Sequence, residues 1–197
     1  MIVGAILAGG MSTRMGAPKS ELKLHGRPVI DVLVEYLRMF CPSTVIVCRD
    51  GLQASTINLP PNVSSICDSE SGKGPLGGLH GALAWARTDS VLLLGCDVPF
   101  VEPALLMKLV HRFQHDQPIA VLPRTPDPNG GWQPQPLCSI WSPRSLPEVG
   151  KALRENRLSL FRLAQEIGAA YMDVSPEEST QLRNVNTRED LRDGLTL

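Results

Sequence analysis

The stretch from residue 2 to residue 19 reads IVGAILAGGMSTRMGAPK, and it decides the fold class. Its first six residues form an apolar run that predicts a short strand. The loop at residues 8–10 (AGG) lets backbone N–H groups approach an anion closely, because glycine carries no Cβ. Arg14 and Lys19 then add positive charge. A strand that runs into such a loop indicates an α/β fold with a phosphate-bearing ligand, most naturally a nucleoside triphosphate, at the end of the first strand.

Two further apolar runs, residues 44–48 (TVIVC) and 91–95 (VLLLG), are typical of strands that are buried on both faces of a parallel sheet. Weaker strand patterns occupy residues 119–122 and 137–141. Between these last two, residues 125–136 contain four prolines and a Gly-Gly pair, and they predict a loop without regular structure. The alternation of strands and helices predicts one domain over residues 1–197, with a mostly parallel, Rossmann-like sheet flanked by helices.

The helices are expected from apolar spacing and from their end signals. One begins at Pro28 and ends at Cys41-Pro42, and another is capped by Ser159 and stops at Gly168. Two others are expected from about Leu79 to Ala86 and from Pro103 to about Phe113, and a Thr187/Asp190 capping box predicts a short last helix.

Charge and cysteine content exclude several classes of protein. The 19 Lys and Arg residues against 20 Asp and Glu residues give a net charge of −1, so we expect neither nucleic acid nor membrane as a partner. The first residues lack the basic start of a signal peptide, and no apolar run approaches the roughly 18 residues of a membrane span. Five widely spaced cysteines without a C-x-x-C pair indicate a reduced, cytoplasmic protein without structural zinc.

Asp68 precedes a second glycine-rich segment, residues 72–79 (GKGPLGGL). A proline-stiffened glycine loop at a helix start can lie flat against a planar base, and Asp68 can then accept hydrogen bonds from the base or the ribose, or lie near a metal. A solvated turn is the alternative interpretation. The segment lacks the spacing of a Walker loop, which we therefore reject.

Asp97 follows the buried strand at residues 91–95. A carboxylate beside incoming phosphates is a natural Mg²⁺ ligand, since magnesium prefers one or two carboxylates together with phosphate oxygens and water. The alternative is a helix-capping aspartate, because Pro99 and Glu102 follow closely.

Asn184 and Asn186 point the same way if their segment is extended, and this arrangement suits a polar second substrate. An ordinary turn is the alternative. His111 and His115 predict a solvated helix face, while Cys48 and Cys96 predict packing in buried strands.

Four segments in this order resemble the molybdenum cofactor guanylyltransferase family, which is MobA-like. They are Leu7–Lys19, Asp68 with residues 74–79, Cys96–Pro99, and Asn184–Thr187 with residues 189–191. The resemblance implies the fold of nucleotide-diphospho-sugar transferases and the transfer of GMP from GTP to molybdopterin, with release of pyrophosphate. It also implies that Asp97 binds nucleotide and Mg²⁺, and that a further group of residues contacts GTP: Leu7, Ala8, Gly9, Gly10, Lys19 and Asp68.

The chain departs from this family at two places. The family often has an Asn-rich turn after the second strand, where this chain reads Val47-Cys48-Arg49-Asp50. The family's closing N-x-N-T-P motif has Arg188 in place of its proline here.

In the mechanism that the resemblance implies, the terminal phosphate of molybdopterin attacks the α-phosphorus of GTP. Mg²⁺ on Asp97 bridges phosphate oxygens, and Lys19, Arg14 and the amides of Gly9 and Gly10 stabilise the developing charge.

Two alternatives stay open. The first is a cytidylyltransferase for the same cofactor, or a transferase acting on sugar or alditol phosphates. Such CTP-using relatives more often read Leu-Ala-Ala-Gly where this chain has Leu-Ala-Gly-Gly. The second is a non-catalytic GTP-binding protein that delivers the cofactor to molybdoenzymes, or to other proteins of cofactor biosynthesis, through apolar surface near Trp132 and Trp141, although both tryptophans can equally pack the core.

Overall fold

A computed structural model describes residues 1–9, 11–12, 17–18, 22–68, 72–127, 130–185 and 190. Eight strands form one central sheet in the order β10-β9-β11-β8-β1-β6-β7, and β12 pairs with β9 outside this path. These strands are β1 (Ile2–Leu7), β6 (Thr44–Cys48), β7 (Ser64–Cys67), β8 (Ser90–Gly95), β9 (Ala120–Pro126), β10 (Trp132–Pro134), β11 (Cys138–Trp141) and β12 (Ala170–Asp173). Two small ladders lie apart from it, β2 (Met11–Ser12) with β3 (Ala17–Pro18), and β4 (Lys23–Leu24) with β5 (Arg27–Pro28).

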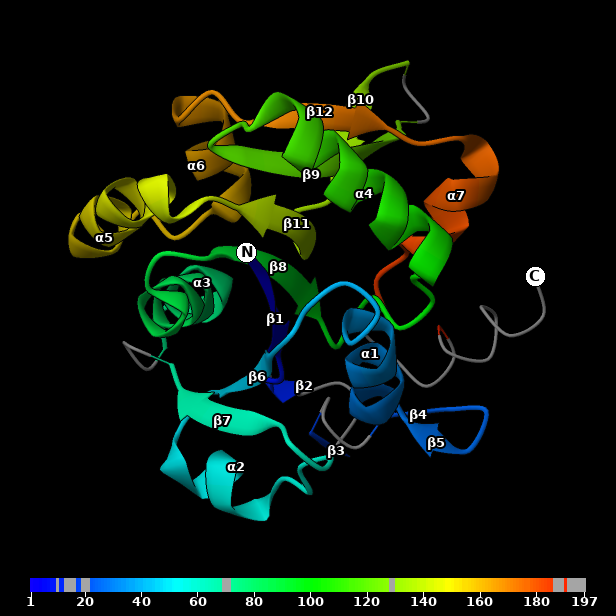
Figure 1. The fold of residues 1–197 in the computed structure, drawn as a ribbon, viewed down its shortest axis with the longest axis vertical. Helices are drawn as coiled ribbons and strands as arrows, with labels where there is room; N and C mark the ends of the chain where they lie inside the picture. Colours follow the sequence, from blue (N-terminus) through cyan, green and yellow to red (C-terminus); the bar gives the residue numbers. More distant parts are fainter. Residues whose placement is uncertain are drawn as a thin grey trace.

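Helices cover both faces of this sheet (Figure 1). Those of the described residues are α1 (Val29–Leu37), α2 (Gly51–Thr56), α3 (Gly74–Ala86), α4 (Pro103–Asp116), α5 (Leu146–Arg154), α6 (Leu160–Glu166), α7 (Pro176–Gln181) and the 3-10 turn η2 (Pro143–Ser145). None of them is long and apolar enough to cross a membrane.

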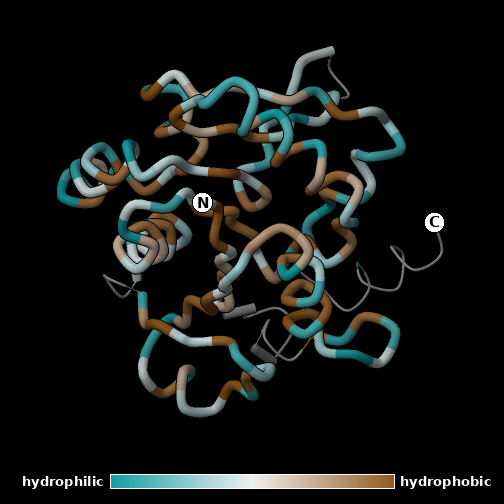
Figure 2. Tube along the Cα trace, viewed as in Figure 1, coloured by the Kyte–Doolittle hydropathy of each residue, from teal (hydrophilic) through white to brown (hydrophobic). Residues whose placement is uncertain are grey.

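The strand β1 shows why the core divides into two layers. Its side chains alternate between the faces, so Ile6 packs with α1 and α4 on one side, while Ala5 and Leu7 pack with α3 on the other. Figure 2 shows the hydrophobic colour of β1 running through the interior from the N-terminus. A strand that is buried on both faces is a continuous apolar run, as the sequence of β1 predicts.

The predicted mostly parallel sheet is confirmed, and its register explains where loops converge. The strand β1 pairs in parallel with β6 and β8, and β6 pairs in parallel with β7. Leu7 lies opposite Val47 on one side and opposite Gly95 on the other, and Cys48 lies opposite Cys67. The carboxyl ends of these four strands therefore meet at one edge. The strand β11 runs antiparallel to its neighbours β8 and β9.

The prediction that residues 125–136 lack regular structure is wrong in part. The strand β9 continues to Pro126 and forms a hairpin with β10, in which Trp132 lies opposite Pro126. The turn closes with hydrogen bonds between Asp127 N and Gly131 O at 2.8 Å and between Gly130 N and Asp127 O at 2.9 Å. The prolines are tolerated because β10 is an edge strand, where a missing N–H breaks no interior ladder.

Two predicted helix boundaries shift, while the Ser159 cap is confirmed by its hydrogen bond from Arg162 N. The helix after Pro28 ends at Leu37, earlier than expected, because Arg38–Phe40 form tighter turns before Cys41. The helix expected from Leu79 begins at Gly74 instead, with its first turns rich in glycine. The capping box of Thr187 lies outside the described residues.

Candidate active site

A cavity of about 190 Å³ opens where β1, β6 and β7 end and α3 begins. Small and apolar side chains form most of its wall, and two of its described residues carry charge, Arg49 and Asp68. The full lining consists of Leu7, Gly9, Val47, Cys48, Arg49, Asp68, Gly72, Gly74, Pro75 and Gly78. Two sequence segments that were separately predicted to face a nucleotide, the loop after β1 and the glycine segment after Asp68, thus share one cavity.

Asp68 stands at the end of β7, where its N–H donates to the carbonyl of Cys48 at 2.7 Å. Its carboxylate lies against Gly77 of α3, so a Cβ placed on Gly77 would contact Oδ1 and lie 3.0 Å from Cγ. Gly78 is similarly close to Leu7, since its Cβ would lie 2.7 Å from Leu7 Cδ2. These approaches explain why α3 starts with glycines of poor helix propensity: tertiary packing here requires the absence of side chains.

The loop after β1 begins in a fixed position. Ala8 N donates to Val47 O at 3.0 Å, and a Cβ on Gly9 would lie 3.3 Å from the backbone nitrogen of Arg49. Leu7, Ala8 and Gly9 therefore occupy the edge of the cavity or its immediate support. The predicted contacts Gly10, Arg14 and Lys19 lie outside the described residues.

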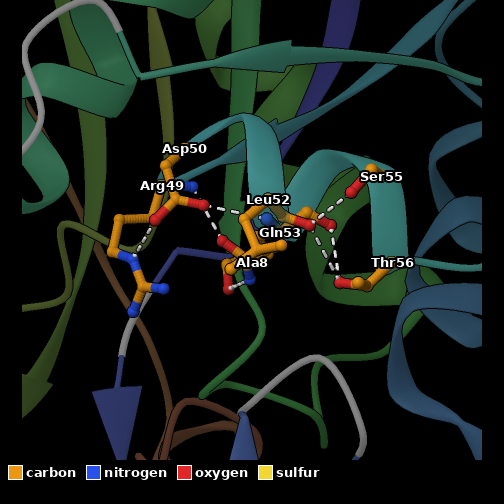
Figure 3. A network of polar contacts seen from close by, with 7 residues as sticks. All are labelled: Ala8, Arg49, Asp50, Leu52, Gln53, Ser55 and Thr56. Carbon is orange, nitrogen blue, oxygen red and sulfur yellow. Dashed lines mark hydrogen bonds and ion pairs between the residues drawn. The ribbon is translucent and has the colours of Figure 1, made fainter.

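A network of hydrogen bonds ties this loop to the turn after β6 (Figure 3). The Gln53 side chain donates from Nε2 to Ala8 O at 2.8 Å and accepts at Oε1 from Arg49 N at 2.7 Å. Asp50 caps α2 by accepting from Gln53 N at 2.8 Å, and its other oxygen accepts from Arg49 Nε at 2.8 Å. These two donors hold the pKa of the Asp50 carboxyl below its ordinary value, the backbone bond first.

Sequence reasoning missed this network because it expected no helix at residues 51–56. It noted Arg49 and Asp50 only as a departure from an Asn-rich turn. The available signal was Asp50 three residues before Gln53, a spacing that suits an N-cap aspartate at the start of a helix.

Asp97 lies in the turn that follows β8, at the edge of the sheet where the carboxyl ends of the parallel strands meet. A Cβ on Gly95 would contact Asp97 Oδ1, so the carboxylate folds back over the strand end. The helix-cap interpretation of Asp97 is wrong, because the N-cap position of α4 is occupied by Glu102. The role of Asp97 as a Mg²⁺ ligand stays a prediction.

The segment containing Asn184 also reaches this edge. Val185 is buried and its N–H donates to the carbonyl of Asp97 at 2.7 Å, which places the exposed Asn184 next to the Asp97 loop. Asn186 lies outside the described residues. The two motifs are about 90 residues apart in the sequence, and the structure brings them together.

Other predicted features have structural rather than catalytic settings. Cys48 and Cys96 are buried as expected, and burial raises the pKa of the Cys48 thiol to about 11. His115 is exposed and bonds to Asp116, and its ring stacks with that of His111 at 6.4 Å between centroids.

Trp141 is fully buried, whereas Trp132 remains 45% exposed. Within the residues that the structure describes, no group of three or more His, Cys, Asp and Glu side chains is arranged to hold a metal.

Comparisons with known proteins identify the family and the fold. The family model of the MobA-like NTP transferase domain matches residues 4–169. A probable molybdenum cofactor guanylyltransferase of Methanothermobacter thermautotrophicus is 31% identical over 194 residues, which cover 95% of this chain and 96% of that relative. A second protein of that description, from Flavobacterium johnsoniae, is 27% identical over 95% of this chain and 93% of its own length. The crystal structure of molybdopterin-guanine dinucleotide biosynthesis protein A from Archaeoglobus fulgidus matches with a TM-score of 0.82 and 27% identity, covering 98% of this chain and 96% of that one.

Proposed function

Because this chain belongs to the family with the MobA-like NTP transferase domain, and is thus a nucleotidyltransferase, we propose that it transfers GMP from GTP to molybdopterin. The observation that carries the proposal is the convergence of the β1 loop, Asp68 and Asp97 at the carboxyl edge of one parallel sheet. Ligands of open α/β sheets bind at this edge. The names of the two relatives and of the structural neighbour supply the acceptor.

The cavity between β1, β7 and α3 takes the base of the nucleotide in this proposal. Drug-sized ligands fill cavities of about 300–1,000 Å³, so a cavity of about 190 Å³ suits one part of a nucleoside triphosphate. Gly74, Pro75 and Gly78 line the cavity with little side-chain bulk, which suits a planar ring, and Asp68 offers an acceptor to its N–H groups.

The phosphates then extend from the cavity along the loop after β1 toward Asp97. The backbone N–H groups of Gly9 and Gly10 bind phosphate oxygens, while Arg14 and Lys19 stabilise the charge that develops on them. The terminal phosphate of molybdopterin is already anionic, so no protein base is needed to activate it. Its oxygen forms a bond to the α-phosphorus of GTP as the bond to pyrophosphate breaks.

A single carboxylate beside phosphates fits the donor set of Mg²⁺, which takes one or two carboxylates and completes its shell with phosphate oxygens and water. Asp97 is the residue that would hold the ion. When bound, Mg²⁺ supplies Lewis-acid neutralisation of the phosphate charge. Asn184, held beside this loop through Val185, orients the acceptor in this proposal, and we assign the same role to Asn186 from the sequence motif alone.

The direct test is pyrophosphate release with molybdopterin, with GTP and CTP offered in parallel and with Mg²⁺ present or chelated. We expect release with GTP and Mg²⁺ only. Release with CTP would keep the fold and the mechanism but overturn the choice of base. Tight GTP binding without release would favour a cofactor-delivery protein, which would then be sought among partners of the molybdoenzymes in the cytoplasm.

A further inference from the structure

Of the two charged residues that the structure describes in the cavity lining, Asp68 has a role in the proposed function and Arg49 has none. Arg49 is among the residues that line the cavity, as is Asp68, and it follows the buried strand β6 directly. We propose that the guanidinium of Arg49 reads guanine by donating to its O6 and N7 atoms, an inference that rests on the proposed use of GTP.

The backbone of Arg49 is fixed on two sides. Its N–H donates to Gln53 Oε1 at 2.7 Å, and Gly9 packs directly against its nitrogen and Cα. Because Gln53 also holds Ala8 O, the loop after β1 and the Arg49 turn form one hydrogen-bonded unit (Figure 3). A reading residue needs such support, since a loosely held side chain loses precision.

The guanidinium is oriented as well. Its Nε donates to Asp50 Oδ2 at 2.8 Å, which uses one nitrogen and aims the fork (Figure 3). Among the described residues, no hydrogen bond engages the two Nη nitrogens, and the side chain is 39% exposed. The fork that Arg uses for bidentate contacts therefore has donors for a ligand.

The charges of the cavity match guanine better than other bases. Guanine offers two neighbouring acceptors, O6 and N7, on one edge, and arginine is their commonest specific partner. It offers N–H donors at N1 and N2 on the adjoining edge, which suit a carboxylate such as Asp68. Adenine replaces the O6 acceptor by an amino donor, and cytosine presents an amino donor, so both would face the guanidinium with a like group.

A phosphate-binding role for Arg49 is the competing interpretation. The presence of Asp68 in the same small cavity disfavours it, because a carboxylate repels phosphate oxygens. The two roles differ in what they require of arginine. A phosphate site needs positive charge, which lysine also supplies, whereas at the O6/N7 edge lysine donates with less geometric precision than the planar fork of arginine.

Equilibrium binding of GTP and 7-deaza-GTP to the full chain separates the two roles, because 7-deaza-GTP has C–H in place of N7 and the same phosphates. Wild type is expected to bind 7-deaza-GTP about tenfold more weakly than GTP. Arg49→Ala should weaken GTP binding by about 5- to 150-fold and bind the two nucleotides equally. Arg49→Lys should show a smaller difference between the two nucleotides than wild type, because a single ammonium replaces the fixed fork. The exposed Arg162→Ala serves as the charge-matched control and should keep the wild-type difference.

Inosine triphosphate, which lacks the 2-amino group, tests the opposite edge of the base. Its loss of affinity relative to GTP should persist in Arg49→Ala, because Arg49 is assigned to O6 and N7 alone. If Arg49→Ala weakens GTP and 7-deaza-GTP by the same factor while Arg49→Lys restores both, Arg49 binds phosphate and the inference is wrong. If wild type binds no GTP in this assay, the proposed function fails, which is a separate outcome.

Discussion

The two halves of the sheet both have apolar, buried side chains in their central strands, but they differ in the direction of those strands. In the half formed by β7, β6, β1 and β8, all strands run in parallel, so their carboxyl ends and following loops meet at one place. In the half formed by β11, β9, β10 and β12, β11 runs against its neighbours and sends its end to the opposite edge. The difference teaches that strand direction, more than residue composition, decides where polar loop residues can gather into a site.

The polar interactions of the parallel half and of the mixed half also differ. The parallel half places Asp68 and Arg49 at a cavity, and the bond from Gln53 to Ala8 O supports the loop beside it. The mixed half uses its exposed polar groups in surface contacts, such as Arg124 with Asp173 and Arg124 over the ring of Trp132. We therefore expect changes in the mixed half to affect stability, and changes at the parallel edge to affect nucleotide binding or turnover.

The largest expected effect lies in the mixed half. Trp141→Ala should lower the free energy of unfolding by about 3–5 kcal/mol, because a fully buried indole is removed and the bond from its Nε1 to Ser139 Oγ is lost. Denaturant unfolding measures the loss, and GTP affinity of the folded fraction should stay close to wild type. Trp132→Ala is the matched control and should cost about 1 kcal/mol, since this ring is half exposed and stacks with Arg124. Equal losses from both tryptophans would contradict the assignment of Trp141 to the core.

Asp97→Ala should have the next largest effect, on catalysis at the parallel edge. Turnover is expected to fall by at least about 100-fold, because the proposed Mg²⁺ ligand is lost, while the fold persists. Steady-state pyrophosphate release measures it, and Asp116→Ala, at an exposed carboxylate that ends α4, provides the control. Near-normal turnover of Asp97→Ala would remove Asp97 from the metal role.

Gly77→Ala tests the close approach of α3 to Asp68. The new Cβ would meet the carboxylate, so Asp68 must move, and GTP affinity should fall by about 10-fold or more although alanine favours the helix. Gly51→Ala is the control, because a Cβ there meets nothing within 4 Å. Unchanged GTP affinity in Gly77→Ala would show that the position of Asp68 is not critical for the base.

The smallest expected effect concerns a buried thiol. Burial raises the pKa of Cys138 from about 9 to about 12, so the folded state holds its proton while the unfolded state releases it above pH 9. The contribution to stability is therefore complete below pH 9 and is lost as the pH rises toward 12. Between pH 8 and 9.5, Cys138→Ala should remove about 1 kcal/mol of the pH dependence of unfolding. Cys67 is exposed, so Cys67→Ala should leave the pH dependence of unfolding unchanged. If both variants changed it equally, burial of the Cys138 thiol would not be its cause.

The sequence predicted β1, β6 and β8 of the parallel half, because these strands are continuous apolar runs. It missed β7, whose four residues are short and only partly buried. In the mixed half it predicted β11 and the first part of β9, and it missed β10 and β12. The strand β12 has only a short, partly buried segment, and the β9–β10 hairpin is hidden among prolines whose effect depends on their place at an edge.

The residues of the candidate site, too, could be predicted from the sequence only in part. Asp97 was singled out because it follows an apolar strand, Asp68 because it precedes a glycine-rich segment, and Leu7 through the family resemblance. Gln53 was not, because its role arises from hydrogen bonds to Ala8 and Arg49, and the first of these joins residues 45 positions apart. The early start of α3 was missed for a similar reason: only the packed structure shows that Asp68 and Leu7 fill the space beside Gly77 and Gly78.

Hydrogen exchange of the backbone amides, with and without GTP and Mg²⁺, tests most directly whether the parallel edge binds the nucleotide. The account predicts new protection in peptides that contain residues 7–9, 48–53 and 72–78, with no change in peptides from α4 and the β9–β10 hairpin. Protection confined to α4 or to that hairpin would contradict the account, because it would place the nucleotide in the mixed half of the sheet.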